Sequence, residues 1–453
     1  MARRTKHQGA ALWTVCAAVA ALAVSAPAAS AQEDQLRAAI AAQMAQGPPA
    51  AGAYVVDLTD GHVVLDDRSD AKRLSASVTK LYTTSTALIE LGRTARVSTV
   101  VRATGRRSGS TWMGDLYLVG GGDFTFGTAA FARKAYGSSA GVGRLAKALR
   151  RSGIRRVSGR VYGDASLYTD NGGTAFELTL CPDPLFGRGC PYGPAGKLER
   201  PIPNGPRTPI GYNRGLQSAT GVKLQTKPAR FAARGLIRAL RGAGISVDGR
   251  AGARISPEDA PTLASVPSPP MSRLTALVNK PSDNYAADNL FRLVGAEVGA
   301  DGSGRGGARV VKSTIRDTFA ITPDIESGSG ETIQDRTSPR ELVTLLTGMR
   351  ARPEGAAFAS SLSLAGRNGT LLRFAGSVVE GRCQLKDGTR VDDVQANTTL
   401  NITGYCTSVS GRPFAFAVMM NGMPLEFVPP DRIESPAYAL QDAIVTALAS
   451  YQG

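Results

Sequence analysis

The sequence predicts a mixed α/β (α+β) protein in which helices pack on an antiparallel sheet and a large domain is inserted into this core. A β-hairpin pattern at residues 53–65 leads directly into an apolar helix pattern, and two strand patterns, 400–406 and 413–420, precede a final helix pattern. From about residue 93 to 262 the pattern changes to alternating strands and helices. We therefore expect this middle segment to be the inserted domain.

The 453-residue chain is too long for one ordinary domain core, so two or three domains are expected. Residues 1–31 have the pattern of a signal peptide. Arg3, Arg4 and Lys6 precede an apolar run, and Ala29-Ser30-Ala31 supplies a small-x-small cleavage site. The run is too short for a comfortable membrane span, and no later stretch is long and apolar enough to replace it. We expect export to the periplasmic or extracellular space, with no stable membrane span after cleavage; the alternative is an uncleaved anchor.

Four cysteines remain after the signal peptide, and an even number in an oxidising compartment suggests two disulfides. Proximity favours Cys181–Cys190, across a loop rich in proline and glycine, and Cys383–Cys406, across a hairpin. Four cysteines allow three connectivities, and free buried thiols are the alternative.

The net charge of +16 becomes +13 without the three cations of the signal peptide. A basic exported protein suits an anionic envelope containing teichoic or other phosphorylated polymers, although free use of arginine by a high-GC organism is an alternative reason. The arginines are scattered along the sequence and no basic run is interleaved with aromatic residues, so we expect no nucleic-acid partner.

Histidine provides an exclusion. Outside the signal peptide there is one histidine, His62, and it follows Asp60-Gly61 in a predicted hairpin turn. A Ser-His-Asp triad or a histidine-containing zinc site would depend on this turn residue. We therefore expect no metal, and a hydrolytic serine in this chain needs a base other than histidine.

In chain order, the hairpin strands at 53–58 and 62–65 flank a Thr-Asp-Gly turn, and a buried helix follows from about Ser77 to Leu91, with Gly92 as its C-cap. Residues three apart share a helix face, which places the amine of Lys80 over the hydroxyl of Ser77. A serine in a first turn beside a partly desolvated lysine can be a nucleophile with its own base, whereas a capping serine and a solvated lysine are the ordinary alternative.

The middle segment begins with strand patterns at 97–104 and 115–119, followed by a glycine cluster at 120–122. This cluster fits neither a P-loop nor a G-x-G-x-x-G spacing, so we interpret it as a structural turn. Helix patterns at 142–152 and 228–243, strand patterns at 156–163 and 245–247, and a long loop at 170–215 complete the segment.

Two further motifs follow in the second half. Ser282-Asp283-Asn284 lies at a break between two helix patterns, where it can direct polar groups into a cleft or simply cap the next helix. Lys386-Asp387-Gly388-Thr389 has the composition of an ordinary hairpin turn. Each motif alone is weak.

Taken together, three motifs in one order resemble the signature set of penicillin-binding proteins and serine β-lactamases: Ser77-x-x-Lys80, Ser282-x-Asn284 and Lys386-x-Gly388-Thr389. Further segments resemble the low-molecular-mass class C penicillin-binding proteins, the D-alanyl-D-alanine carboxypeptidase/endopeptidase family: Tyr117–Thr125, Gly211–Gly215, Lys280–Asn284, Gly369–Leu371 and Ala415–Val418. The separation of 202 positions from Lys80 to Ser282 leaves room for the insert of that family, whereas serine β-lactamases have a much shorter gap.

The resemblance implies a serine β-lactamase/transpeptidase-like core, made of residues 32–92 and 263–453, with the inserted domain at 93–262. It implies an exported serine D,D-peptidase of the cell-wall space that acts on peptidoglycan stem peptides through an acyl-enzyme. β-Lactams are then acylating inhibitors, and no cofactor is implied.

The same resemblance assigns roles to residues. Ser77 is the nucleophile, Lys80 accepts its proton, and Ser282 relays a proton to the leaving amine. Substrate-binding residues are Asn284, which also holds the lysine, together with Lys386, Gly388 and Thr389. The backbone N–H groups of Ser77 and Thr389 form the oxyanion hole.

The sequence departs from the family pattern at several positions. Asp387 stands where the family has threonine, and an anion there repels a D-alanine carboxylate unless it points away or pairs with Lys386. Ser327 replaces the aspartate of a D-G-S-G loop, Asp288 replaces a glutamate, and the segment from Thr389 to Gly404 is longer than usual. Two alternatives therefore stay open: a catalytically impaired scaffold that binds peptidoglycan, and a serine β-lactamase.

Overall fold

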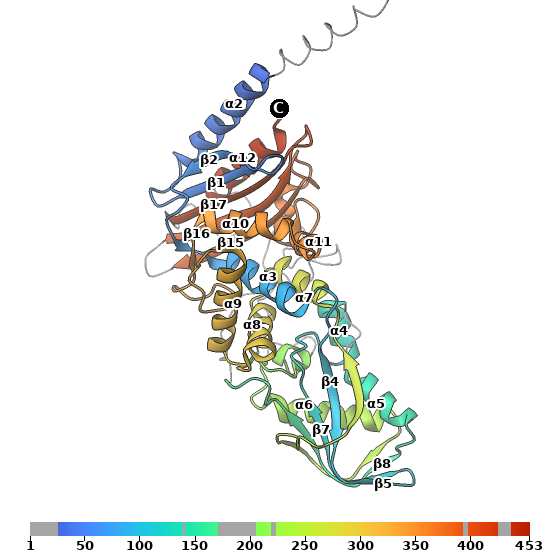
Figure 1. The fold of residues 1–453 in the computed structure, drawn as a ribbon. Coiled ribbons are helices and arrows are strands. Elements are labelled where there is room, and N and C mark those ends of the chain that lie inside the picture. The colour runs from blue at the N-terminus through green and yellow to red at the C-terminus, as the bar shows by residue number, and fades with distance from the viewer. Residues whose placement is uncertain (1–25, 138–140, 171–204, 219–222, 393–396, 425–435) are drawn as a thin grey trace, which may run out of the picture.

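The computed structural model describes residues 26–137, 141–170, 205–218, 223–392, 397–424 and 436–453. The molecule is elongated (Figure 1). Segments from both ends of the chain form one part, and the middle of the chain forms the other. The prediction of an α/β core with a large insert is confirmed at this level.

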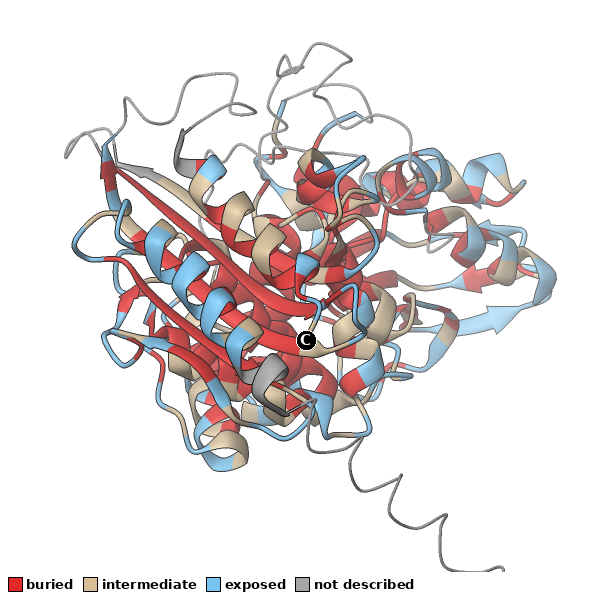
Figure 2. Ribbon diagram, turned by 90° about the horizontal axis from the view of Figure 1, so that it is seen from above, coloured by how far each residue is buried: buried red, intermediate tan, exposed pale blue. Residues whose placement is uncertain are grey.

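A six-stranded sheet lies at the centre of the first part, in the order β14-β15-β16-β17-β1-β2 with antiparallel neighbours. Its strands are β1 (Gly52–Asp57), β2 (Val63–Asp67), β14 (Ser363–Leu364), β15 (Cys383–Asp392), β16 (Asn397–Thr407) and β17 (Pro413–Pro424). Strand β17 is apolar along most of its length because both faces of the sheet are covered. Figure 2 shows these strands buried beneath helices whose outer faces are exposed.

Successive side chains of β17 enter two different cores, as the pleat of a strand requires. Phe414, Phe416 and Val418 pack on one face, where α2 (Ala26–Met44) and α12 (Pro436–Ser450) lie. On the other face Ala415 and Ala417 contribute to the largest apolar core among the described residues. Their small side chains let the helices approach the sheet closely.

The helices of this larger core surround α3 (Lys80–Leu91), which begins just after Ser77 and ends at Gly92, whose φ is +88°. The other helices are α7 (Met271–Asn279), α8 (Asn284–Gly299), α9 (Gly304–Phe319), α10 (Pro339–Arg350) and α11 (Gly355–Ser361). Three short 3₁₀ turns are η1 (Ala76–Thr79), η2 (Tyr212–Gly215) and η3 (Gly369–Phe374), and a small two-stranded ladder joins β3 (Arg73–Leu74) to β13 (Arg336–Thr337).

The middle part contains a five-stranded sheet, β11-β9-β7-β4-β12, and a four-stranded sheet, β10-β8-β6-β5. Their strands are β4 (Ser98–Ala103), β5 (Arg106–Ser108), β6 (Thr111–Met113), β7 (Leu116–Val119), β8 (Arg156–Val157), β9 (Val161–Asp164), β10 (Ser246–Val247), β11 (Ala251–Ala253) and β12 (Thr262–Pro267). The helices are α4 (Ala129–Tyr136), α5 (Val142–Arg151) and α6 (Pro228–Gly242). This part, hereafter the insert, has its own apolar core, and its last strand, β12, pairs with β4 and runs to Pro267.

A disulfide joins Cys383 to Cys406, which face each other on β15 and β16, so this predicted pair is confirmed. Cys181 and Cys190 lie outside the described residues, as do residues 1–25 of the expected signal peptide. Among the described residues, no helix is long and apolar enough to cross a membrane.

Candidate active site

Ser77 lies in the 3₁₀ turn η1, and the α-helix proper starts at Lys80. The predicted continuous helix from Ser77 is therefore wrong in its first turn, which is wound more tightly. This difference hardly changes how Ser77 and Lys80 face each other, because residues three apart also superpose in a 3₁₀ turn. The Lys80 Nζ donates to Ser77 Oγ at 2.7 Å and to the carbonyl of Ser329 at 2.8 Å. Lys80 is fully buried, so its amine is held at the hydroxyl, as proton transfer requires.

Two asparagines on the sheet hold the chain in front of Ser77. Asn421 accepts from the backbone N–H of Leu74 at 2.7 Å, and Asn401 donates to the carbonyl of Ser75 at 2.9 Å. These contacts support the left-handed backbone of Ala76, whose φ is +44°. Sequence reasoning missed both asparagines; their signal was an amide inside an otherwise apolar strand pattern.

The second and third motifs meet through Lys386. Its Nζ donates to Ser282 Oγ at 2.9 Å and to the carbonyl of Asp387 at 2.5 Å. Ser282 lies in the turn between α7 and α8 and has a left-handed backbone, with φ of +57°. Lys386 is fully buried, and this burial lowers its pKa, although the Asp387 carboxylate opposes the effect. A buried ammonium thus lies beside the Ser282 hydroxyl.

Asp387 pairs with Lys386, which is one of the two arrangements that would reduce its repulsion of a carboxylate. Its Oδ1 lies 3.2 Å from Lys386 Nζ and accepts from Thr370 Oγ1 at 2.6 Å. Burial favours the neutral acid, but the Lys386 cation and the Thr370 hydroxyl outweigh it and hold the pKa of Asp387 below its usual value. Asp387 is therefore ionised at neutral pH, and its negative charge offsets part of the positive charge of Lys386.

Gly388 lies against the turn of Ser77. A Cβ at this position would stand 3.1 Å from the backbone nitrogens of Ser77 and Val78. A side chain at this position would therefore push β15 and the turn of Ser77 slightly apart, and glycine allows their close approach. The next residue, Thr389, has its hydroxyl 3.1 Å from that of Tyr438 on α12, so its side chain is engaged away from Lys386.

Asn284 is the first residue of α8, and Asp283 caps this helix by accepting from the N–H of Ala286. The Asn284 amide donates to Glu331 Oε1 at 3.3 Å. Its Oδ1 is buried and has no hydrogen-bond partner in the part of the chain that the structure describes.

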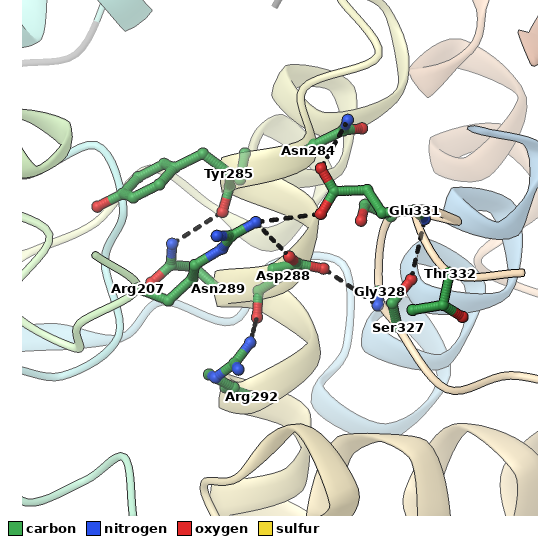
Figure 3. Close-up of polar contacts among 12 residues, drawn as sticks. Arg207, Asn284, Tyr285, Asp288, Asn289, Arg292, Ser327, Gly328, Glu331 and Thr332 are labelled. Atoms are coloured by element: carbon green, nitrogen blue, oxygen red, sulfur yellow. Dashed lines mark hydrogen bonds and ion pairs between the residues drawn. The ribbon is translucent and has the colours of Figure 1, made fainter. Parts of the chain in front are cut away.

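Glu331 belongs to a buried ion network that sequence reasoning missed (Figure 3). Arg207, from the insert, lies 2.8 Å from Asp288 and 3.2 Å from Glu331. Asp288, which stands where the family has glutamate, also accepts from the N–H of Gly328 at 3.2 Å. Burial raises the pKa of Asp288, and Arg207 opposes this rise. A residue of the insert therefore reaches the neighbourhood of Asn284.

The loop that holds Lys80 is built around Ser327 and Asp335. Ser327 stands where the family has aspartate, and its Oγ donates to Asp335 Oδ2 at 2.6 Å. The other carboxylate oxygen of Asp335 accepts from the N–H of Ser327 at 3.0 Å. Asp335 thus supplies the carboxylate that position 327 lacks, and the loop presents the Ser329 carbonyl to Lys80.

A second residue of the insert, Arg214, forms a buried ion pair with Asp283, the middle residue of the Ser-Asp-Asn motif. Arg214 also donates to the hydroxyl of Tyr136 at 3.1 Å, and its guanidinium lies 4.8 Å from the ring centre of Tyr285. Arg214 lies in one of the segments that carried the family resemblance, and it brings that segment into contact with the Ser-Asp-Asn motif.

No group of histidine, cysteine and acidic residues in the described ranges could hold a metal ion. His62 contacts Asp60 at 2.6 Å and Glu33 at 2.8 Å at the turn between β1 and β2. Hydrogen bonding to Asp60 raises the pKa of His62.

The chain is similar in sequence to carboxypeptidases of other organisms. The chain is 26% identical over 471 residues to "D-alanyl-D-alanine carboxypeptidase" of Actinomadura sp. (strain R39), covering 89% of this chain and 81% of that one. It is 28% identical over 382 residues to "Carboxypeptidase DacB" of Mycolicibacterium smegmatis, covering 81% and 75%.

A solved structure shares the fold. Penicillin binding protein 4 (dacB) from Haemophilus influenzae superposes with a TM-score of 0.69 at 17% identity, covering 90% of this chain and 98% of that one. The same protein complexed with a β-lactam gives a TM-score of 0.64 at 18% identity, with 91% and 99% covered. The D-Ala-D-Ala carboxypeptidase 3 (S13) family matches residues 36–175 and 215–442, and the chain belongs to this family.

Proposed function

We propose that this protein is a serine D,D-peptidase that cleaves the D-alanyl-D-alanine end of peptidoglycan stem peptides, with Ser77 as the nucleophile. The observation that carries the proposal is the 2.7 Å contact between Lys80 Nζ and Ser77 Oγ, with Lys80 fully buried. Membership of the S13 family supports the reaction type.

In the proposed reaction, Lys80 takes the proton of Ser77 as its oxygen attacks the carbonyl carbon of the penultimate D-alanine. The N–H groups of Ser77 and Thr389 stabilise the negative charge that develops on the carbonyl oxygen. Ser282, hydrogen-bonded to Lys386, relays a proton to the leaving D-alanine amine. Water then hydrolyses the acyl-enzyme.

The pairing of Asp387 with Lys386 bears on the strength of substrate binding. Lys386 is the cation proposed to attract the terminal carboxylate, and Asp387 neutralises part of its charge at 3.2 Å. We infer that the enzyme retains the chemical step but binds a carboxylate terminus more weakly than an enzyme with threonine at this position.

We infer that the reaction takes place in the periplasmic or extracellular cell-wall space. The pattern of residues 1–31 supports export, because it combines cations, an apolar run and a small-residue cleavage site.

The experiment that tests the function is the intact mass of the protein after incubation with benzylpenicillin, with Ser77→Ala as the control. We expect one stable adduct, absent from the control, together with release of D-alanine from a peptide that ends in D-Ala-D-Ala. Rapid hydrolysis of penicillin without an adduct would instead show a β-lactamase. If the protein shows neither an adduct nor hydrolysis of penicillin, the remaining interpretation is a peptidoglycan-binding scaffold. Repulsion of the substrate carboxylate by Asp387 would then be the first explanation for the lost activity.

A further inference from the structure

The positive charge of the chain is concentrated in the insert. Residues 93–262 contain 27 Lys and Arg against 10 Asp and Glu, a net charge of +17, whereas the rest of the chain contains 26 against 27, a net charge of −1. The basic residues are therefore divided almost equally between the two parts, and the insert differs because it contains few acidic residues to balance them. Without Arg3, Arg4 and Lys6 of the expected signal peptide, the core that carries the candidate active site contains 23 basic and 27 acidic residues, a net charge of −4.

Two neighbouring helices of the insert, α5 and α6, carry much of this charge. Together they contain eight basic residues and no acidic residue. Arg230, Arg234, Arg238 and Arg241 are all exposed on α6, and their spacing of four, four and three residues places them along one face. A helix of 15 residues extends about 22 Å, and the four arginines lie along most of that length.

Some of these basic side chains differ from those of α9 because they form no ion pair with the described residues. On α9 three cations pair with carboxylates: Arg309 with Asp301, Lys312 with Glu326, and Arg316 with Asp317. Among the described residues, Arg230 and Arg234 of α6 and Arg151 of α5 form no ion pair; an exposed pair of the insert joins Arg156 to Asp248.

The apolar side chains of the two helices are used inside the insert. Leu145 and Leu149 of α5, and Leu236 and Leu240 of α6, are buried in its core. The exposed face therefore presents charged groups. Helices that bind at a membrane surface insert apolar side chains into the bilayer, and the leucines of α5 and α6 are buried and cannot do so. Arginine also suits phosphate in particular, because its planar guanidinium donates two parallel hydrogen bonds to phosphate oxygens.

We propose that the exposed face of α5 and α6 binds a linear, phosphodiester-linked anionic polymer of the cell envelope. The proposal rests on the proposed function, since it names a partner that would hold the enzyme beside its wall substrate. Figure 1 shows α5 and α6 in the lower part of the molecule, apart from α3 near its middle, so a polymer bound to them need not cover α3.

Binding of purified protein to a synthetic poly(glycerol phosphate) chain tests the proposal. The test variant is Arg230→Gln/Arg234→Gln/Arg241→Gln on α6. The matched control is Arg305→Gln/Arg309→Gln/Arg316→Gln, three exposed arginines on α9, which removes the same charge from the core. We expect the α6 variant to lose at least tenfold in affinity and the α9 variant less than twofold. The affinity of the wild-type protein should fall steeply with added salt.

Three outcomes would overturn the proposal: absence of polymer binding by the wild-type protein, equal losses in the two variants, or tighter binding to vesicles of phosphatidylglycerol than to the polymer. The penicillin adduct on Ser77 is measured in the same preparations. An adduct of equal extent in all three proteins shows that they are folded, and it separates failure of the polymer site from failure of the proposed peptidase.

Discussion

The candidate active site and the basic face of the insert treat positive charge in opposite ways. In the site, each of the buried cations Lys386, Arg207 and Arg214 has a carboxylate beside it. On α6, Arg230 and Arg234 are exposed and form no ion pair within the described residues. A buried charge needs a partner to offset its desolvation, and that partner fixes its position. An exposed arginine is solvated by water and needs no such partner, so its charge can attract an anionic ligand.

The site also contains strained backbone. Ala76, Ser282 and Arg214 have left-handed backbones, as Arg68, Ala300 and Ala320 do elsewhere in the described residues. Such conformations cost about 1–3 kcal/mol each and persist where neighbours hold them. The helices α5 and α6 are regular by contrast. The comparison suggests that ion pairs in the site stabilise a geometry that the local sequence would not adopt alone.

Breaking a buried pair should have the largest effect. Arg214→Gln leaves the Asp283 carboxylate buried without its cation, so we expect a loss of about 3–5 kcal/mol in unfolding free energy. The strained turn of Ser282 should loosen as well, and peptidase activity should fall to near background. Urea unfolding and D-alanine release measure both effects. Arg214→Gln/Asp283→Asn should recover part of the stability, and a single variant as stable as wild type would show that the pair does not hold the turn.

Removing the partner of Lys386 should raise the activity, whereas removing the partner of Asp283 should lower it. Asp387→Thr frees the whole charge of Lys386 for the substrate carboxylate, so we expect kcat/KM to rise about tenfold, or about 1.4 kcal/mol. The matched substrate is the same peptide with its terminal carboxylate converted to an amide, for which the variant should gain less than twofold. An equal gain on both substrates would mean that Asp387 acts on the chemical step and not on the terminus.

The sequence was sufficient for the order of the motifs and for the pairing of Lys80 with Ser77, because both depend on local spacing. It was also sufficient for Cys383–Cys406, which face each other across one hairpin. It could not place Arg207 or Arg214 beside the Ser-Asp-Asn motif. Those contacts join residues 81 and 69 positions apart across two structural parts, and no local pattern reports them.

Substitutions in the family pattern were also unreadable without the structure. Ser327 looked like the loss of a carboxylate, yet its hydroxyl donates to the carboxylate of Asp335, eight residues further along. Asp387 looked repulsive, and only its contacts with Thr370 and Lys386 show where its charge is directed. A motif states which residue types are present, whereas the partners of each residue come from tertiary packing.

A smaller change concerns the link between the insert and Asn284. Glu331→Gln keeps a group that can accept from Asn284 but removes the charge that Arg207 contacts at 3.2 Å. Because Arg207 retains Asp288, we expect unchanged stability and a rise in KM of about three- to fivefold, with kcat nearly constant. Glu331→Ala, which removes the acceptor as well, should lower kcat too. If the two variants behave identically, the carboxylate does not position Asn284.

Asp123 provides the subtlest test, since it is a buried carboxylate without a cation. Its Oδ1 accepts from the N–H and hydroxyl of Thr125, while its Oδ2 has no partner among the described residues. Burial raises the pKa of Asp123 from 3.8 to about 6. Between these values the folded state retains a proton that the unfolded state has released, so stability falls as pH rises through this window. Asp123→Asn cannot ionise, and its thermal midpoint relative to wild type should therefore increase from pH 4.5 to 7. A difference that stays constant with pH would mean that Asp123 is charged in the fold despite lacking a cation, contrary to the rule that the active site otherwise follows.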